Sequence, residues 1–139
     1  MSRVLSVDYG RKRTGIAVTD PLQITAGGLV TVATHELEKF LLDYVNKEDV
    51  ELIVIGEPRQ PDGTPSENLA RVQQFVNRWK KVSTVPITYY DERFTSVLAH
   101  QTMIEAGLKR KDRQNKALVD QISATIILQD YLQYKQNHR

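Results

Sequence analysis

The stretch Val-Leu-Ser-Val-Asp-Tyr-Gly-Arg-Lys-Arg-Thr-Gly-Ile-Ala-Val, residues 4–18, decides the fold. It contains two apolar runs, 4–7 and 15–18, separated by a short polar and basic connection. Two such runs predict a β-hairpin. The first run is followed directly by Asp8, so the predicted hairpin places a carboxylate at the end of its first strand.

The residues that follow predict a third strand, a helix and a buried strand. Residues 24–32 suit a strand that Gly27-Gly28 would bend or bulge. In 37–45 the apolar residues recur every three or four positions, which indicates an amphipathic helix with Thr34 as a possible N-cap. The continuous β-branched run 52–56 is typical of a parallel strand covered on both faces.

The second half of the chain alternates loops, helices and one more strand. Residues 57–65 hold three prolines and predict an irregular loop, after which Ser66 is expected to cap a helix with an apolar stripe through Trp79. Residues 86–90 predict a strand and 96–106 a helix that Gly107 would end. A basic segment then leads into a last helix of about 20 residues.

This order of elements predicts one α/β domain spanning residues 1–139. The sheet is expected to be mixed and five-stranded, with antiparallel hairpins first and parallel strands after them, and to be flanked by helices. A length of 139 residues suits one domain and one core.

Composition excludes several classes of function. The chain has no cysteine, which rules out a disulfide scaffold, a thiolate metal site and a cysteine nucleophile. No apolar run is long enough to span a membrane, the start does not resemble a secretion signal, and we expect a cytoplasmic protein. The net charge of +2 permits a nucleic-acid partner without indicating one.

Acidic residues follow three of the predicted strands or lie on the last helix. In open α/β sheets, functional sites gather outside the carboxyl ends of the strands. The positions concerned are Asp8, Glu57, Asp91, Glu92 and Asp120. We therefore expect acidic side chains to converge at one end of the sheet.

Each acidic position also has a purely structural interpretation. An Asp after a strand is often a turn former, and Glu57 could pair with Arg59. Asp120 lies on a mainly apolar helix face, where a carboxylate needs a partner such as Lys116 or a metal.

Converging carboxylates without a cysteine or histidine cluster favour Mg²⁺ or Mn²⁺ over zinc. Two such ions about 3.5–4 Å apart can stabilise the attacking and leaving oxygens of phosphodiester cleavage. The histidines, His35, His100 and His138, are scattered, so covalent acyl chemistry is not expected.

Four blocks of the sequence, in this order, resemble the bacterial YqgF/RuvX family. They are Val-Asp-Tyr-Gly-Arg-Lys-Arg-Thr-Gly-Ile-Ala-Val-Thr-Asp at 7–20, Val-Ile-Gly-Glu-Pro at 54–58, Asp-Glu-Arg-Phe-Thr-Ser at 91–96, and Lys-Ala-Leu-Val-Asp-Gln-Ile-Ser-Ala at 116–124. The resemblance covers nearly the whole chain and implies a single RNase H-like nuclease domain. It also implies that Asp8, Glu92 and Asp120 form a catalytic triad that binds Mg²⁺ or Mn²⁺, as two ions when substrate is present.

The resemblance implies two possible substrates. The family is described as a nuclease that matures the 5′ end of pre-16S ribosomal RNA, and also as a Holliday-junction resolvase by its likeness to RuvC-type resolvases. The sequence does not decide between RNA and branched DNA. A resolvase that cuts two strands symmetrically would be expected to form a homodimer.

Basic residues flank the acidic positions in sequence and are candidates for binding phosphates. They are Arg11, Lys12, Arg13, Arg93, Lys109, Arg110, Lys111, Arg113 and Lys116. The structural alternative is that they are solvated loop charges.

Two other functions are compatible with the sequence. Asp8-Tyr9-Gly10, followed by Gly15, resembles the first phosphate loop of actin and sugar-kinase folds, but those folds enclose a nucleotide between two lobes. A non-catalytic nucleic-acid-binding or ribosome-assembly module would bind without metal-dependent turnover.

Overall fold

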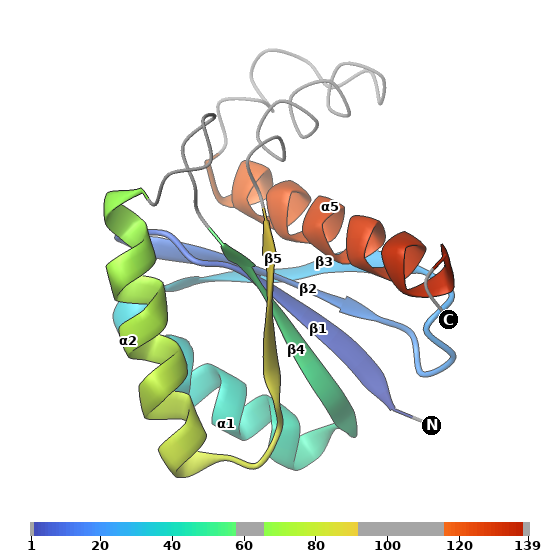
Figure 1. The fold of residues 1–139 in the computed structure, drawn as a ribbon, viewed down its shortest axis with the longest axis horizontal. Helices are drawn as coiled ribbons and strands as arrows, with labels where there is room; N and C mark the ends of the chain where they lie inside the picture. The colour runs from blue at the N-terminus through green and yellow to red at the C-terminus, as the bar shows by residue number, and fades with distance from the viewer. Residues whose placement is uncertain (1, 58–65, 92–115, 138–139) are drawn as a thin grey trace.

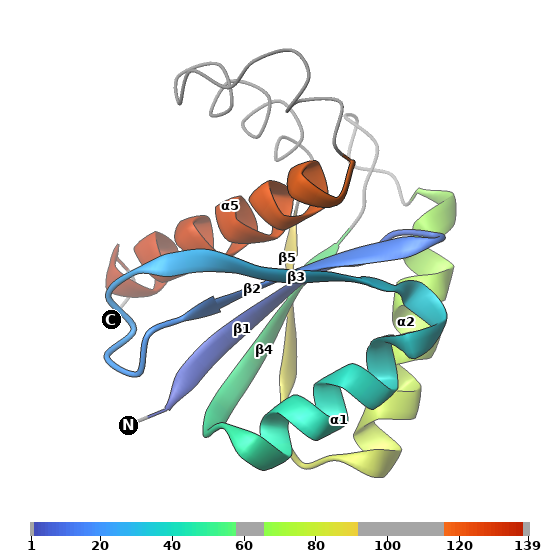
Figure 2. The same cartoon turned by 180° about the vertical axis from the view of Figure 1, so that it is seen from behind.

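The protein forms a five-stranded mixed sheet with helices on both faces (Figures 1 and 2). The computed structural model describes residues 2–57, 66–91 and 116–137. The strands are β1 (Arg3–Asp8), β2 (Arg13–Thr19), β3 (Ala26–Ala33), β4 (Val50–Glu57) and β5 (Ile87–Asp91), in the spatial order β3-β2-β1-β4-β5. Strands β3, β2 and β1 are antiparallel, whereas β1, β4 and β5 are parallel. This arrangement confirms the predicted mixed sheet.

The helices divide between the two faces of this sheet. A short 3₁₀ turn, η1 (Thr34–Glu36), leads into α1 (Leu37–Lys47), and α1 shares one face with α2 (Glu67–Val82). The long helix α5 (Lys116–Asn137) lies across the other face, mainly over β2, β3 and β1 (Figure 2). The helix predicted at 96–106 lies outside the described residues.

Alternation along β1 connects the two layers of the core. Leu5 and Val7 belong to the cluster formed with α1 and α2, whereas Val4 packs against α5. Ser6, also on the α5 face, donates a hydrogen bond from Oγ to the carbonyl oxygen of Ala124 at 2.6 Å. Because successive strand side chains point to opposite faces, β1 contributes to the core on both sides of the sheet, with α1 and α2 on one side and α5 on the other.

Helix α2 buries the predicted apolar stripe. Its members, Leu69, Val72, Phe75, Val76 and Trp79, are all at most 5% exposed. Burial of each large side chain contributes about 1.5–3 kcal/mol. The Trp79 indole Nε1 donates to the carbonyl of Val85 at 2.9 Å, which satisfies its polar atom inside the core. Ser66 occupies the N-cap position, although its side chain does not cap the first turn.

Two local expectations differ from the structure, and a third, the irregular strand at 24–32, is confirmed apart from its bounds. Thr34 does not cap α1: the N-cap is Glu36, and the Thr34 hydroxyl donates instead to the carbonyl of Gly10 at 2.7 Å. Glu57 is the last residue of β4 and not a loop residue. Strand β3 begins at Ala26, and the expected irregularity is a bulge at Leu29, where the pairing with β2 shifts register beside Gly28.

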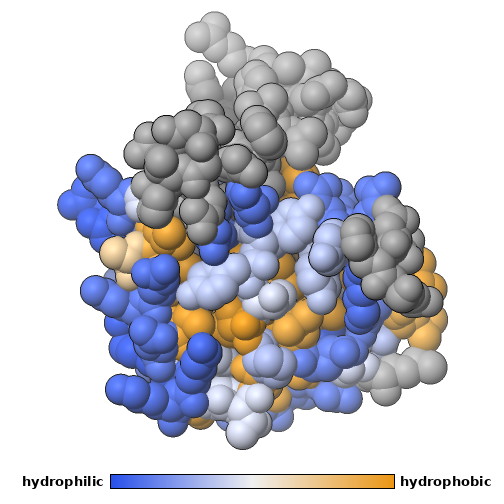
Figure 3. Space-filling model, viewed as in Figure 1, coloured by the Kyte–Doolittle hydropathy of each residue, from blue (hydrophilic) through white to orange (hydrophobic). Residues whose placement is uncertain are grey.

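The molecular surface is mixed in polarity. Apolar side chains reach the surface in the middle of the face drawn in Figure 3, where β5 runs, and hydrophilic side chains cover α2. Among the described residues, no helix is both long and apolar enough to cross a membrane.

Candidate active site

The carboxyl ends of three parallel strands meet at one edge of the sheet. Strands β1, β4 and β5 end at Asp8, Glu57 and Asp91. Glu57 pairs with Asp91 in register, and Val7 pairs with Ile55. Continuing the second register by one residue places Asp8 beside the end of β4. The predicted gathering of acidic residues at this edge is therefore found for these strands.

Alternation assigns these three carboxylates to two different faces. Asp8 is two and four residues from Ser6 and Val4, which face α5, so Asp8 also lies on the α5 face. Glu57 has the parity of Ile53 and Ile55, which belong to the α1 and α2 cluster. Asp91 has the parity of Ile87, which packs against that same cluster. Of the strand-end carboxylates described, Asp8 alone shares the face of α5.

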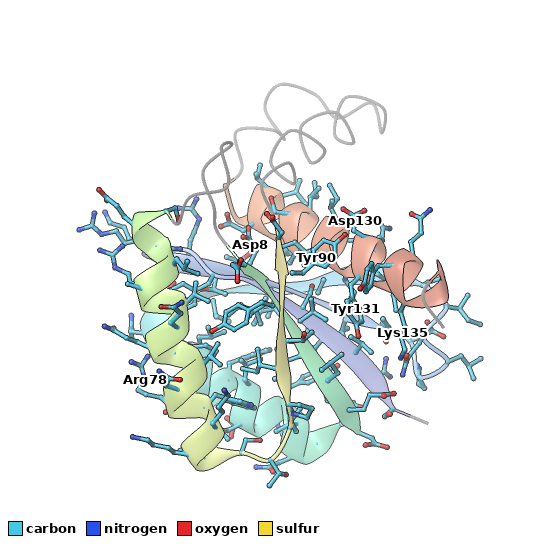
Figure 4. All side chains as sticks on the ribbon, viewed as in Figure 1. Asp8, Arg78, Tyr90, Asp130, Tyr131 and Lys135 are labelled. Carbon is cyan, nitrogen blue, oxygen red and sulfur yellow. The ribbon has the colours of Figure 1, made fainter. Side chains whose placement is uncertain are left out.

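Asp120 lies near the start of α5, directly over the hairpin that carries Asp8. Gly15 of β2 pairs with Asp8 across the antiparallel ladder. A Cβ built on Gly15 would overlap the backbone carbonyl oxygen of Asp120. The helix backbone therefore rests on β2 opposite Asp8, an approach that only glycine permits. Figure 4 shows Asp8 at the end of the sheet, below the first turns of α5.

An ion pair holds the Asp120 side chain. Arg13 Nε, at the start of β2, lies 2.5 Å from Asp120 Oδ2. The Asp120 side chain is 19% exposed and that of Arg13 is 41% exposed. A charge-assisted hydrogen bond of this kind fixes the orientation of a carboxylate. The partner that the sequence suggested, Lys116, has a side chain outside the described set.

Two further contacts fix the position of α5 on the sheet. The buried hydrogen bond from Ser6 to the Ala124 carbonyl joins the helix to β1. At Gly28 of β3, a Cβ would lie 3.1 Å from the side chain of Gln121. Small or short residues on β1, β2 and β3 thus bring the helix, and Asp120 with it, close to the sheet.

The donor set at this edge suits a hard divalent cation. Asp8 and Asp120 offer carboxylate oxygens on the same face, and Mg²⁺ is commonly bound by one or two carboxylates, waters and substrate phosphates. Among residues 2–57, 66–91 and 116–137, no group of three or more acidic, histidine or cysteine side chains could hold a metal. Glu92, the third residue of the expected triad, lies outside the described residues.

Part of the predicted basic set surrounds this edge. Arg11 and Lys12 are exposed in the turn between β1 and β2, and Arg13 pairs with Asp120. The other predicted phosphate-binding residues, Arg93, Lys109, Arg110, Lys111 and Arg113, lie outside the described residues, as does the side chain of Lys116.

The structure adds a basic residue that the sequence did not single out. Arg78 on α2, labelled in Figure 4, lines a groove of about 640 Å³ together with Arg11 and Lys12. On the sequence it is one of several charges on the polar side of an amphipathic helix, and no local motif distinguishes it.

Farther along α5, Asp130 is half-buried beside β5. Burial raises the pKa of its carboxyl group above the usual range. Burial, together with the nearby charge of Asp130, also raises the pKa of Tyr90, and both residues are labelled in Figure 4.

Comparison with solved structures defines the fold. The fold matches T. thermophilus RuvC in complex with a Holliday junction substrate with a TM-score of 0.58, at 17% sequence identity and covering 96% of both chains. It matches the Fowlpox virus resolvase in complex with Holliday junction DNA with a TM-score of 0.56, at 13% identity, covering 96% of this chain and 98% of the other. The chain has the RNase H-like fold of these resolvases.

The family follows from the sequence. Residues 2–134 match the family model described as "RuvX: Holliday junction resolvase", and the chain belongs to this family. Proteins from Phocaeicola vulgatus and Bacteroides fragilis are 61% and 62% identical to it over 136 residues, covering 97% of this chain and 98% and 99% of theirs. A protein from Flavobacterium johnsoniae is 54% identical, covering 97% of this chain and 99% of its own. All three are named "Putative pre-16S rRNA nuclease". The resemblance seen in the sequence is confirmed.

Proposed function

We propose that the chain is a divalent-metal-dependent endonuclease that acts on structured nucleic acid and processes the 5′ end of pre-16S rRNA. The observation that carries this proposal is the placement of Asp8 and Asp120 on one face at one edge of the sheet. The names of the closely similar relatives support the substrate. We further propose that residues 1–139 act as one nuclease domain, in the cytoplasm.

Asp8, Glu92 and Asp120 are the proposed metal ligands and catalytic residues. When bound, Mg²⁺ or Mn²⁺, as one or two ions, would activate the attacking water and stabilise the leaving oxygen of the phosphodiester. The carboxylates bind and position the cation. The bridge from Arg13 engages Oδ2 of Asp120. Because a carboxylate accepts more than one contact, Asp120 can hold a cation while it keeps this bridge.

The basic residues near this edge are proposed to bind the phosphate backbone. Arg11 and Lys12 project from the turn that follows Asp8, so they can contact phosphates next to the one being cleaved. Arg93, Lys109, Arg110, Lys111, Arg113 and Lys116 are proposed for the same role from their place in the sequence. Their contacts would raise affinity without selecting a base sequence.

A second candidate function is resolution of Holliday junctions. The family description and the two matching folds, both solved with junction DNA, favour it. This function would require two copies of the chain, because two strands are cut symmetrically. A non-catalytic nucleic-acid-binding module is the alternative of another class.

The deciding experiment compares two labelled substrates, a pre-16S rRNA leader and a four-way DNA junction, with Mg²⁺, Mn²⁺ or a chelator. We expect metal-dependent cleavage of the leader by the wild type and its loss in Asp8→Asn. Glu57→Gln is the matched control, because it removes a carboxylate at the same sheet edge but on the opposite face. Cleavage by Asp8→Asn at the wild-type rate would contradict the proposed site.

The same experiment separates the three functions. Preferential cleavage of the four-way junction would favour Holliday-junction resolution over rRNA processing as the function. Binding of either substrate without cleavage under all metal conditions would favour the non-catalytic module.

A further inference from the structure

A basic groove lies on the other side of the sheet edge from Asp120. It has a volume of about 640 Å³ and is bounded by the β1–β2 turn, η1, the start of α1 and the middle of α2. Its cationic side chains are Arg11, Lys12 and Arg78, and Glu38 is the one acidic residue among the residues that line it in the described part of the chain. Such an excess of positive charge favours an anionic ligand.

The groove also has an aromatic wall. Tyr9 and Phe75 both line it, and their ring centroids lie 5.8 Å apart with an angle of 40° between the planes. Phe75 is buried in the core, whereas Tyr9 is only half-buried. A ring held from behind and exposed on one side can stack against a nucleobase.

Hydrogen bonds hold the walls of the groove in place. Thr34 of η1 donates from its backbone to the Lys12 carbonyl at 3.0 Å and from its hydroxyl to the Gly10 carbonyl at 2.7 Å. Its hydroxyl also lies 2.9 Å from that of Thr14. These bonds fasten the turn that carries Arg11 and Lys12 to η1, so the cationic side chains project from a fixed backbone.

Helix α2 is fastened to the same turn. Asn68 Nδ2 donates to the carbonyl of Tyr9 at 2.8 Å. The helix that carries Arg78 and Phe75 is therefore tied to the backbone of Tyr9, and the aromatic and cationic walls are preorganised relative to each other. Preorganised groups lose less entropy when a ligand binds.

The groove begins one residue after Asp8. Asp8 lies on the α5 face, whereas Tyr9 packs with the core on the α1 and α2 face. A strand whose phosphate lies at Asp8 can turn around the sheet edge over the basic turn and enter the groove. The next nucleotides of such a strand must be unpaired, because a base that stacks on Tyr9 has left its helix.

From these contacts we infer that the groove binds an unpaired nucleotide of the nucleic-acid substrate, with the base on Tyr9 and phosphates at Arg78 and the Arg11–Lys12 turn. The identity of the polymer rests on the proposed function. The groove is distinct from the carboxylate site, and its occupancy can be measured without cleavage.

The test is binding of a fluorescently labelled single-stranded RNA of about ten nucleotides, a length within the usual range for single-strand sites. Binding is followed by anisotropy in chelator, so that no cleavage occurs. We expect Arg78→Gln to weaken binding about three- to tenfold and to lower the slope of log affinity against log salt by about 0.7. Lys80→Gln is the matched control, because Lys80 is another exposed cation on α2 and does not line the groove. Equal effects of Arg78→Gln and Lys80→Gln would overturn the inference.

The aromatic wall has its own test. Tyr9→Phe keeps the ring and should bind nearly as well as the wild type, whereas Tyr9→Leu should weaken single-strand binding about tenfold, with circular dichroism melts to confirm folding. A duplex of the same sequence should be insensitive to Tyr9→Leu. Equal losses for single strand and duplex would overturn the stacking role.

A last arm distinguishes a polymer from a free nucleotide. Adenosine monophosphate should displace the labelled RNA only at concentrations far above those at which unlabelled RNA does so. Displacement by both at the same nucleotide concentration would make the groove a mononucleotide site and overturn the inference. Because no arm uses cleavage, full activity of Asp8→Asn would contradict the proposed chemistry without affecting these results.

Discussion

Arg13 and Asp120 are 107 positions apart in the sequence, yet Arg13 Nε lies 2.5 Å from Asp120 Oδ2. The bridge joins the first residue of β2 to the start of α5, and it does so on the face where Asp8 ends β1. The positively charged side chain of Arg13 thus lies beside Asp120, which is a proposed metal ligand. The arginine orients the carboxylate and also opposes the binding of a second positive charge there.

Replacing this arginine should strengthen metal binding. Arg13→Gln removes a positive charge next to Asp120, and for a partly exposed pair this is worth about 0.2–1 kcal/mol, or up to about fivefold in affinity. We expect calorimetric titration with Mn²⁺ to show tighter binding by this variant. Arg11→Gln, which changes the net charge equally but lies in the exposed turn, should bind Mn²⁺ nearly as the wild type does. Weaker binding by Arg13→Gln would mean that orienting Asp120 matters more than the charge.

Adding one methyl group at Gly15 should disturb both stability and the site. In Gly15→Ala the Cβ overlaps the Asp120 carbonyl, so α5 has to move away from β2, and overpacking of this kind costs about 1–3 kcal/mol. Gly27→Ala in β3 is the control, because a Cβ there meets no atom within 4 Å. Urea unfolding of the two variants measures the difference. Equal stabilities would show that the helix accommodates the methyl group without cost.

The hydroxyl of Ser6 should contribute to the docking of α5. Ser6→Ala removes this buried hydrogen bond to the Ala124 carbonyl, and the loss of one such bond costs about 0.5–1.5 kcal/mol. Ser2→Ala removes an exposed hydroxyl that donates to Glu51 at 2.8 Å and should change stability much less. Thermal melts of both variants test this expectation, and a larger loss for Ser2→Ala would contradict it.

The stability of the protein should depend on pH through Asp130. Burial raises the pKa of this carboxyl in the folded state above its unfolded value, so ionisation at neutral pH opposes folding. Asp130→Asn should therefore stabilise the protein slightly at pH 7, and the advantage should disappear as the pH falls below the ordinary aspartate range and the wild-type carboxyl becomes protonated. Melting temperatures measured at pH 7 and near pH 3.5 test the sign. Asp43→Asn, on the exposed side of α1, provides the control.

Much of the fold could be predicted because the spacing of apolar residues along the sequence reflects which side chains each element buries. The apolar stripe of α2 repeats at the helical period. The β1–β2 hairpin shows as two apolar runs around a polar turn, and the buried run of β4 is continuously apolar, as is typical of a strand covered on both faces. The local errors occurred where a polar side chain had a choice of partner. Thr34 could cap α1 or bond the preceding turn, and only the folded chain brings the Gly10 carbonyl within its reach.

The sequence predicted at which edge of the sheet the acidic residues would gather, but not which side chains they would contact. Strand ends indicated where Asp8, Glu57 and Asp91 would gather, and alternation along each strand then separates them by face. The partner of Asp120 could not be read from the helix, because Arg13 comes from a strand more than 100 residues away. The aromatic and basic groove was equally hidden, since its walls come from four separate elements.

The alternation of β1 also restricts how this sequence can change. Ser6 and Asp8 face α5 because both are an even number of residues from Val4, and Leu5 and Val7 face α2 for the same reason of parity. Deleting or inserting a single residue within β1 would turn the proposed catalytic carboxylate toward the face covered by α1 and α2, and Val7 toward the α5 face. Length variation among relatives should therefore be confined to the connections between strands, while the central strand keeps a constant number of residues between its first buried valine and its terminal aspartate.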